Sequence, residues 1–172
     1  VAAVGNVTIG AGQLNSATSG QAPSGSASVI VQKISSSADV SLIAAADIRD
    51  AFTDLTNAII NIRSVNLQLL AGGKVGNSTV TSPNYLDFKI SGAASANAGN
   101  DVYLNAVESH LMVGNIESVK DVYLKASKSI LDSESDNSFQ DISLTGNTDI
   151  KAVSIHLNAL KGGIGQFGNQ LE

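Results

Sequence analysis

Three aspartates recur at a fixed spacing and are candidate metal ligands. Asp101, Asp121 and Asp141 lie 20 residues apart, each followed by a short apolar-polar-apolar segment. If 20 residues make one coil of the chain, the carboxylates stack, and like charges about 5 Å apart repel by on the order of 1 kcal/mol per pair in water. Two interpretations relieve this repulsion. Each aspartate caps its own turn while Lys120 and solvent screen it, or a calcium ion bridges the three carboxylates.

Two tyrosines in the same segments are candidate sugar-binding residues. Tyr103 and Tyr123 hold the same position in consecutive segments, so their rings are expected on adjacent strands and on the outward face, together with Asn105 and Lys125. Neighbouring aromatic rings stack on the apolar face of a sugar. The alternative interpretation is packing between strands, which aromatic side chains favour in β structure.

Other residues give little support for catalysis. His110 and His156 have no acidic or serine partner at a suggestive spacing. The glycines of 163–168 match the fingerprint of dinucleotide sites, but that chemistry needs a following helix to hold the pyrophosphate, and only four residues remain. The acidic residues fall mainly in turns. We therefore expect no enzymatic activity and no cofactor, with calcium the only ion considered.

Composition excludes several classes of protein. The chain has 172 residues, 43% of them hydrophobic and 15% charged, with a net charge of −5 and no cysteine. The hydrophobic content argues against a disordered chain, and ten basic residues are too few for nucleic-acid binding. Disulfides and thiolate metal sites are impossible, and no apolar run reaches the roughly 18 residues of a transmembrane segment.

The chain repeats itself on two scales. Segments 29–34, 39–44 and 48–50 match 111–116, 121–126 and 130–132 at a constant offset, which divides the chain into super-repeats at 1–82 and 83–172. The first includes a loop rich in Ser and Gly at 15–26. The two super-repeats are expected to form one continuous domain, and the patterned last residues indicate a fragment of a longer protein.

Within the second super-repeat the 20-residue step holds short strands that cannot bury an apolar face alone. Neighbouring units must therefore stack, which predicts an all-β fold, a parallel β-solenoid of roughly eight rungs. The competing interpretation is a helix over 47–62, where apolar residues also follow helical spacing. The expected interior residues are Val40, Leu42, Ala44, Val102, Leu104, Ala106, Val122, Leu124, Ala126, Ile142, Leu144, Ile155, Leu157 and Ala159. The expected outward residues are Ser41, Tyr103, Tyr123, Lys125 and His156.

These repeats resemble a known family. The segments 121–130, 162–165 and 168–172 resemble repeats of giant bacterial surface and secreted proteins of the filamentous haemagglutinin type, and the likeness covers about 29–172. The resemblance implies a right-handed parallel β-helix, a location outside the bacterium or on its surface, and a structural or adhesive role. No functional residue of the family maps onto this stretch.

The sequence thus favours a rigid β-helical shaft segment of a large adhesin-like protein. Its expected partners are other copies or flanking repeats, stacked end to end through unpaired strand edges. The second class is a carbohydrate-binding module that holds host or matrix glycans on the outer face through Tyr103 and Tyr123. The third is a polysaccharide-cleaving enzyme, because β-helices also carry such sites.

Overall fold

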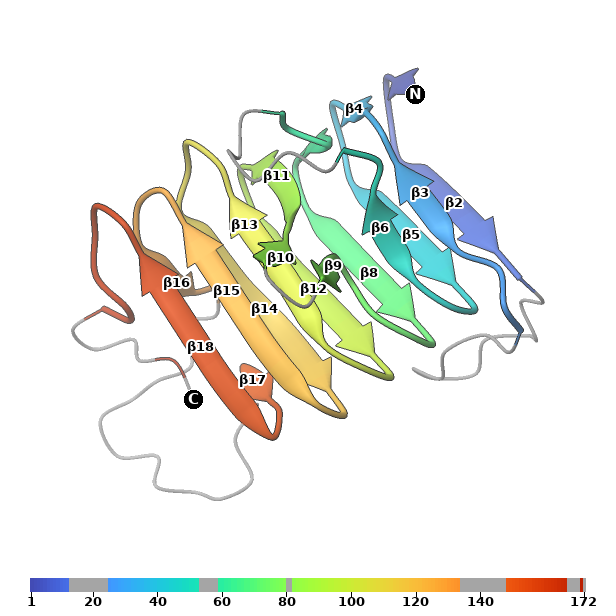
Figure 1. The fold of residues 1–172 in the computed structure, drawn as a ribbon. Coiled ribbons are helices and arrows are strands. Elements are labelled where there is room, and N and C mark those ends of the chain that lie inside the picture. The colour runs from blue at the N-terminus through green and yellow to red at the C-terminus, as the bar shows by residue number, and fades with distance from the viewer. Residues whose placement is uncertain (13–24, 53–58, 80–81, 134–147, 167–170, 172) are drawn as a thin grey trace.

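The protein is an all-β structure built from parallel strands. The computed structural model describes residues 1–12, 25–52, 59–79, 82–133, 148–166 and 171, and these residues form strands and turns without any helix. The strands succeed one another side by side from β1 and β2 at one end to β18 at the other (Figure 1). None of the described residues forms a helix that is long and apolar enough to cross a membrane.

Two seven-stranded sheets form the body of the protein, and every strand pair in them is parallel. The first sheet runs in the order β1 (Ala2–Ala3), β4 (Ile34–Ser36), β7 (Ile62–Ser64), β11 (Leu86–Ile90), β13 (Val102–Ala106), β15 (Asp121–Ala126) and β18 (Ser154–Ala159). The second runs in the order β16 (Ile130–Asp132), β14 (Leu111–Ser118), β12 (Ala93–Ala98), β8 (Leu67–Ala71), β5 (Val40–Ala44) and β2 (Val7–Ala11), with β17 (Ile150–Lys151) also paired to β14.

Two smaller strand pairs complete the fold. β3 (Val29–Val31) pairs in parallel with β6 (Ile48–Asp50), and isolated bridges continue this line from Ile48 to Val75 and from Val75 to Val102. β9 (Asn77–Thr79) and β10 (Ser82–Asn84) form an antiparallel hairpin inserted between β8 and β11. Parallel strands stacked in this way fit a β-solenoid.

One hydrophobic core lies between the sheets and draws on both. In β5, Val40, Leu42 and Ala44 are buried while Ser41 and Ile43 are only half-buried, as expected for alternating side chains. Because the pairing is in register, each buried position continues into its neighbours. Ala44, for example, pairs with Ala11 on one side and with Ala71 on the other. Each fully buried Val, Leu or Ile side chain stabilises the folded state by about 1.5–3 kcal/mol relative to an exposed one.

Most of the predicted interior is confirmed. The expected residues of β5, β13 and β15 are all buried. Leu157 and Ala159 of β18 pack against the core and are partly buried, and Ile155 pairs with Val122 but is 46% exposed because β18 is the edge strand of the first sheet. Ile142 and Leu144 lie outside the described residues. The helix expected as an alternative over 47–62 is wrong at both ends, which form β6 and the start of β7; residues 53–58 are not described.

The structure tests the 20-residue step directly. The 20-residue step is confirmed between β13 and β15, where Val102 pairs with Val122. It fails at the next step, because the strand beside β15 is β18 and Ser154 takes the place beside Asp121 that was predicted for Asp141. The longer repeat aligns β5 with β15, but these strands belong to different sheets. That self-similarity therefore reflects a shared strand-and-turn pattern. Both sheets continue across residues 82 and 83, through β7–β11 and β8–β12.

The inward columns predict a sharp difference between two substitutions to aspartate. Leu124 is 1% exposed and lies between Leu104 and Leu157, so Leu124→Asp is expected to lower the free energy of unfolding by about 3 kcal/mol or more. Val119→Asp, at a turn residue that is 70% exposed, serves as the control and should stay within about 0.5 kcal/mol of wild type. Urea unfolding followed by circular dichroism measures both, and equal midpoints for Leu124→Asp and wild type would contradict the inward assignment.

Candidate functional site: an aromatic stack beside a charged row

Three rings stack across the outer face of the first sheet. Tyr103 pairs with Tyr123, and Tyr123 pairs with His156, on β13, β15 and β18. The ring centroids of the two tyrosines lie 4.6 Å apart with an interplanar angle of 8°, and those of Tyr123 and His156 lie 4.4 Å apart at 2°. In-register parallel pairing creates this stack, because it places equivalent side chains one strand spacing apart. The predicted juxtaposition of Tyr103 and Tyr123 is confirmed.

The expected exposure of Tyr103 is wrong. Its side chain has the outward phase, yet the residue is only 6% exposed. The chain entering the β9–β10 hairpin passes directly over it, since a Cβ atom on Gly76 would lie 2.7 Å from the Cβ of Tyr103. Gly76 has a φ of +77°, a conformation that glycine adopts without strain. Tyr85, which follows the hairpin, covers the ring edge-on at 6.0 Å between centroids.

The two tyrosines therefore offer ring edges more than ring faces. Tyr123 lies between Tyr103 and His156, so both of its faces are in contact with neighbouring rings. A sugar that stacks on an aromatic residue needs an open face. Asn105, expected beside the tyrosines, is 2% exposed. This geometry favours packing between strands, and sugar binding by Tyr103 and Tyr123 stays a prediction.

The hydroxyl groups of two tyrosines are held in their protonated form. Burial raises the pKa of Tyr85, with added contributions from Tyr103 and Tyr123. Burial also raises the pKa of Tyr123. The neighbouring Tyr103 acts in the same direction once it ionises at high pH, and the carboxylates of Asp121 and Asp101 do so because their negative charges disfavour a second negative charge nearby. These rings are thus neutral packing elements at physiological pH.

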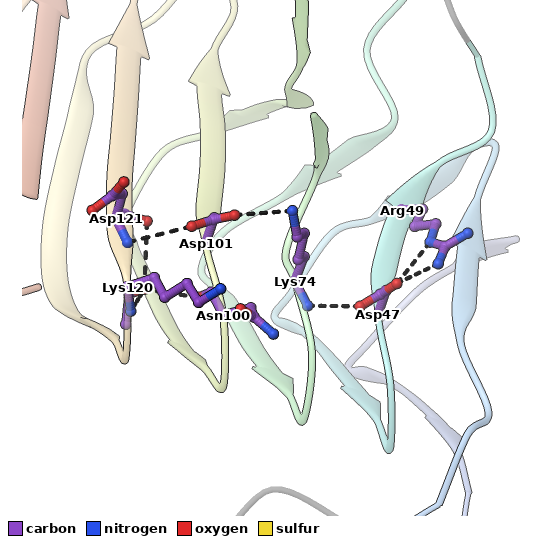
Figure 2. A network of polar contacts seen from close by, with 8 residues as sticks. Asp47, Arg49, Lys74, Asn100, Asp101, Lys120 and Asp121 are labelled. Carbon is purple, nitrogen blue, oxygen red and sulfur yellow. Dashed lines mark hydrogen bonds and ion pairs between the residues drawn. The ribbon is translucent and has the colours of Figure 1, made fainter. Parts of the chain in front are cut away.

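A row of charged residues lies at the strand ends (Figure 2), where Asp101 and Asp121 precede Tyr103 and Tyr123 by two residues each. Asp47 Oδ1 accepts a hydrogen bond of 2.7 Å from the backbone N–H of Lys74, and Lys74 Nζ lies 3.0 Å from Asp101 Oδ2. Asp101 Oδ1 in turn accepts a 3.5 Å contact from the backbone N–H of Asp121. Arg49 closes the other end of the row through an ion pair with Asp47.

Two contacts reduce the repulsion between the neighbouring carboxylates of Asp101 and Asp121: the Lys74 ammonium pairs with Asp101, and Asp101 accepts a contact from the Asp121 backbone N–H. The residue next to Asp101 on one side is Lys74, and beyond Asp121 the paired position is Ser154. The predicted column of three carboxylates is therefore wrong, and Asp141 lies outside the described residues. The described residues contain no group of three or more His, Cys, Asp or Glu that could hold a metal ion. A calcium ion at Asp101 and Asp121 would have to displace the Lys74 ammonium; it stays a prediction.

The pKa values of this row follow from its contacts. Burial raises the pKa of Asp47, but the hydrogen bond from the Lys74 backbone and the pairing with Arg49 outweigh burial and leave it lowered. The hydrogen bond to Asp101 raises the pKa of Lys74 more than burial lowers it. Both groups therefore carry full charge at neutral pH, as structural ion pairs require.

A buried row of amides and carboxylates was not foreseen from the sequence. Asp50, Asn61, Asp87 and Asn105 are each 8% exposed or less. Asn61 donates to Asp50 at 2.6 Å and accepts from the backbone N–H of Asp87 at 2.9 Å, while Asn105 donates to Asp87 at 2.6 Å. These bonds anchor the end of the excursion between β6 and β7 to the first sheet. Asp87 and Asn105 occupy outward-facing positions of their strands, which by sequence alone are expected to be exposed. The sequence pattern does not show which loop covers the outer face of the sheet.

The histidines and the glycine motif have structural roles in the described part of the chain. His110 Nδ1 accepts a hydrogen bond from the Ser129 backbone, and His156 ends the aromatic stack. Gly165 has a φ of +71° beside the bridge from Ile130 to Ile164, which is turn geometry. Comparisons of the chain with protein-family models, with curated proteins and with solved structures find no match.

The charged row predicts acid sensitivity. Because the pKa of Asp47 lies below the ordinary value of 3.8, its ionised form stabilises the folded state above that pH, and this contribution disappears as the pH falls through the folded pKa. The free energy of unfolding should fall on acidification below about pH 5, and Asp47→Asn should show a shallower fall. Urea unfolding between pH 7 and the acid limit of solubility, roughly pH 2, measures this.

Arg49→Gln provides the companion variant. It removes one of the partners that lower the pKa of Asp47, so its pH dependence should lie between those of wild type and Asp47→Asn. Superimposable acid profiles for all three proteins would show that the row does not contribute to pH-dependent stability.

Proposed function

We propose that this chain is a shaft segment of a large bacterial surface or secreted protein of adhesin type, and that it presents binding regions located elsewhere. The observation that carries the proposal is the run of parallel strands in both large sheets, whose inward positions form mostly apolar columns. Such stacking makes a stiff, extended body, because main-chain hydrogen bonds and apolar burial are repeated at every strand. The resemblance of 121–130 and 162–165 to filamentous haemagglutinin repeats supports the same role.

The proposal extends to the winding and location of the shaft. We infer a closed, right-handed parallel β-helix of roughly eight rungs, since crossover connections between parallel strands are right-handed in nearly all proteins. The seven strands of the first sheet are compatible with this number. The shaft would lie outside the bacterium or on its surface. The proposal includes no catalysis, because Asp47 and Asp101 are in ion pairs and the tyrosines are packed against each other.

End-to-end contact with other copies or flanking repeats is the proposed mode of partnership. β18 is the outer strand of the first sheet, and apolar side chains are exposed there and just beyond it. Ile155, Leu160 and Ile164 are 46%, 55% and 51% exposed, although Ile155 and Ile164 each lie in register with a buried residue. A further strand laid on β18 would bury them and complete its backbone hydrogen bonds.

The location is tested with antibodies raised against the purified chain. Intact, washed cells of the source bacterium, and their culture medium, should give a signal without lysis. A cytoplasmic protein in the same cells serves as the control and should be detected only after lysis. Detection of this chain only after lysis would refute the proposed location.

End-to-end assembly is tested by sedimentation velocity over a concentration series. Wild type should shift to larger species as concentration rises, and Ile155→Lys should remove the shift by placing a charge in the proposed contact. Ile164→Lys is the second variant, and Val65→Lys, at an exposed turn between β7 and β8 in the middle of the sheets, is the matched control. A monomer that persists at all concentrations, or assembly that survives both β18-end variants, would contradict this mode of contact.

A further inference from the structure

The outer face of the second sheet carries a shallow groove that the shaft role does not use. A hollow of about 450 Å³ crosses the strands β5, β8, β12 and β14, which lie side by side in Figure 1. A second hollow of about 390 Å³ adjoins it and shares Ser41, Gln68 and Ser95 with it. The residues lining the larger hollow are Ser41, Ile43, Gln68, Leu69, Leu70, Ser95, Ala96, Asn97 and Asn115. None of them carries a charge.

The strand register arranges this groove into two parallel rows. Ser41, Gln68 and Ser95 pair with one another and form a row of hydroxyl and amide groups. Two residues further along each strand, Ile43 and Leu70 pair and form an aliphatic row, which ends in Asn97. Neighbouring strands lie about 4.8 Å apart, so the groups in each row repeat at that interval.

A bulge places one more amide at the rim. Ala94 pairs with Val113 and Ala96 pairs with Ile116, so Gly114 and Asn115 of β14 together oppose Ser95. The backbone N–H of Asn115 donates to Ser95 Oγ at 3.3 Å, and Gly114 leaves no room for a side chain, since a Cβ there would lie 2.5 Å from Ser95 Oγ. Bulges inside a sheet redirect side chains and are common beside binding sites. Here the bulge makes the exposed Asn115 line the groove.

Most polar side chains of the groove make only long contacts within the protein, although Asn115 Nδ2 donates a hydrogen bond of 3.3 Å to the backbone oxygen of Thr148. Ser41 Oγ and Gln68 Oε1 are 3.5 Å apart, and so are Asn97 Nδ2 and Glu117 Oε2, at the outer limit of a hydrogen bond. These groups retain donors and acceptors for a ligand. The groove has no deep pocket for an aromatic or charged anchor of the kind that dominates protein interfaces. It suits an extended ligand that is uncharged, rich in hydroxyl groups and partly apolar.

We propose that this groove binds a neutral, β-1,4-linked polysaccharide chain that lies across strands β5, β8, β12 and β14. One pyranose residue of such a chain advances by about the spacing between strands. Because successive sugars of such a chain are turned over relative to one another, alternate sugars can repeat the same contacts, with hydroxyl groups on the row of Ser41, Gln68 and Ser95 and C–H groups on Ile43 and Leu70. This site lies on the opposite sheet from Tyr103 and Tyr123, and it goes beyond the shaft function without depending on it.

The test uses cellohexaose and β-1,4-mannohexaose as probes, with a heparin hexasaccharide as the charged comparison. Two-dimensional NMR of the full chain should show that at least one neutral hexasaccharide shifts amide resonances of β5, β8, β12 and β14 and leaves the first sheet unchanged. The double variant Gln68→Ala/Asn115→Ala should weaken that binding about tenfold, as loss of roughly two hydrogen bonds predicts. Arg63→Ala, an exposed residue on the first sheet, is the matched control and should bind as wild type does.

Circular dichroism and the melting temperature establish that both variants are folded. The proposal is overturned if neither neutral hexasaccharide shifts the second sheet, if only heparin binds, or if the double variant binds as tightly as wild type. Such failures leave the shaft proposal standing, because assembly and surface exposure report on that proposal independently.

Discussion

The constraint on which this structure depends is in-register pairing of parallel strands, which places chemically related residues directly beside one another. Apolar residues are stabilised by this arrangement, because each is buried against an apolar neighbour. Val40, Leu42 and Ala44, for example, pair with Leu67, Leu69 and Ala71. In-register pairing does not by itself stabilise a column of charged residues, because like charges one strand spacing apart repel each other. At every outward and turn position, the side chain must therefore be compatible in charge and hydrogen bonding with the side chains beside it on the neighbouring strands.

Three different solutions appear on the first sheet and its strand ends. The Lys74 ammonium lies between the carboxylates of Asp47 and Asp101 and separates their negative charges. Amides and carboxylates share hydrogen bonds where an excursion buries the outer face, between Asn61, Asp87 and Asn105. Flat rings stack where the outer face is partly open. The second sheet differs, because its central outward residues are uncharged and short or aliphatic and leave a groove free.

Much of the fold could be predicted from alternation of apolar and polar residues, since burial of one strand face imposes it directly. The 20-residue step placed Tyr103 beside Tyr123 for the same reason. The partner of β15 could not be predicted, because Asp141–Leu144 carries the same local pattern as β18, and only long-range pairing distinguishes them. The burial of Tyr103 and Asn105 could not be predicted either, since it depends on connecting segments that fold back onto the outer face of the sheet. The groove needed the register of four strands and a bulge.

The β9–β10 hairpin has a wider consequence. The sheets on either side of it keep their register, with β7 on β11 and β8 on β12, although the connection between them departs from the body of the protein. Lengthening a connection costs little, because closure entropy grows only with the logarithm of loop length. Such corners are therefore natural grafting positions, where evolution or an engineer can attach new sequence as cargo while the scaffold beneath keeps its architecture.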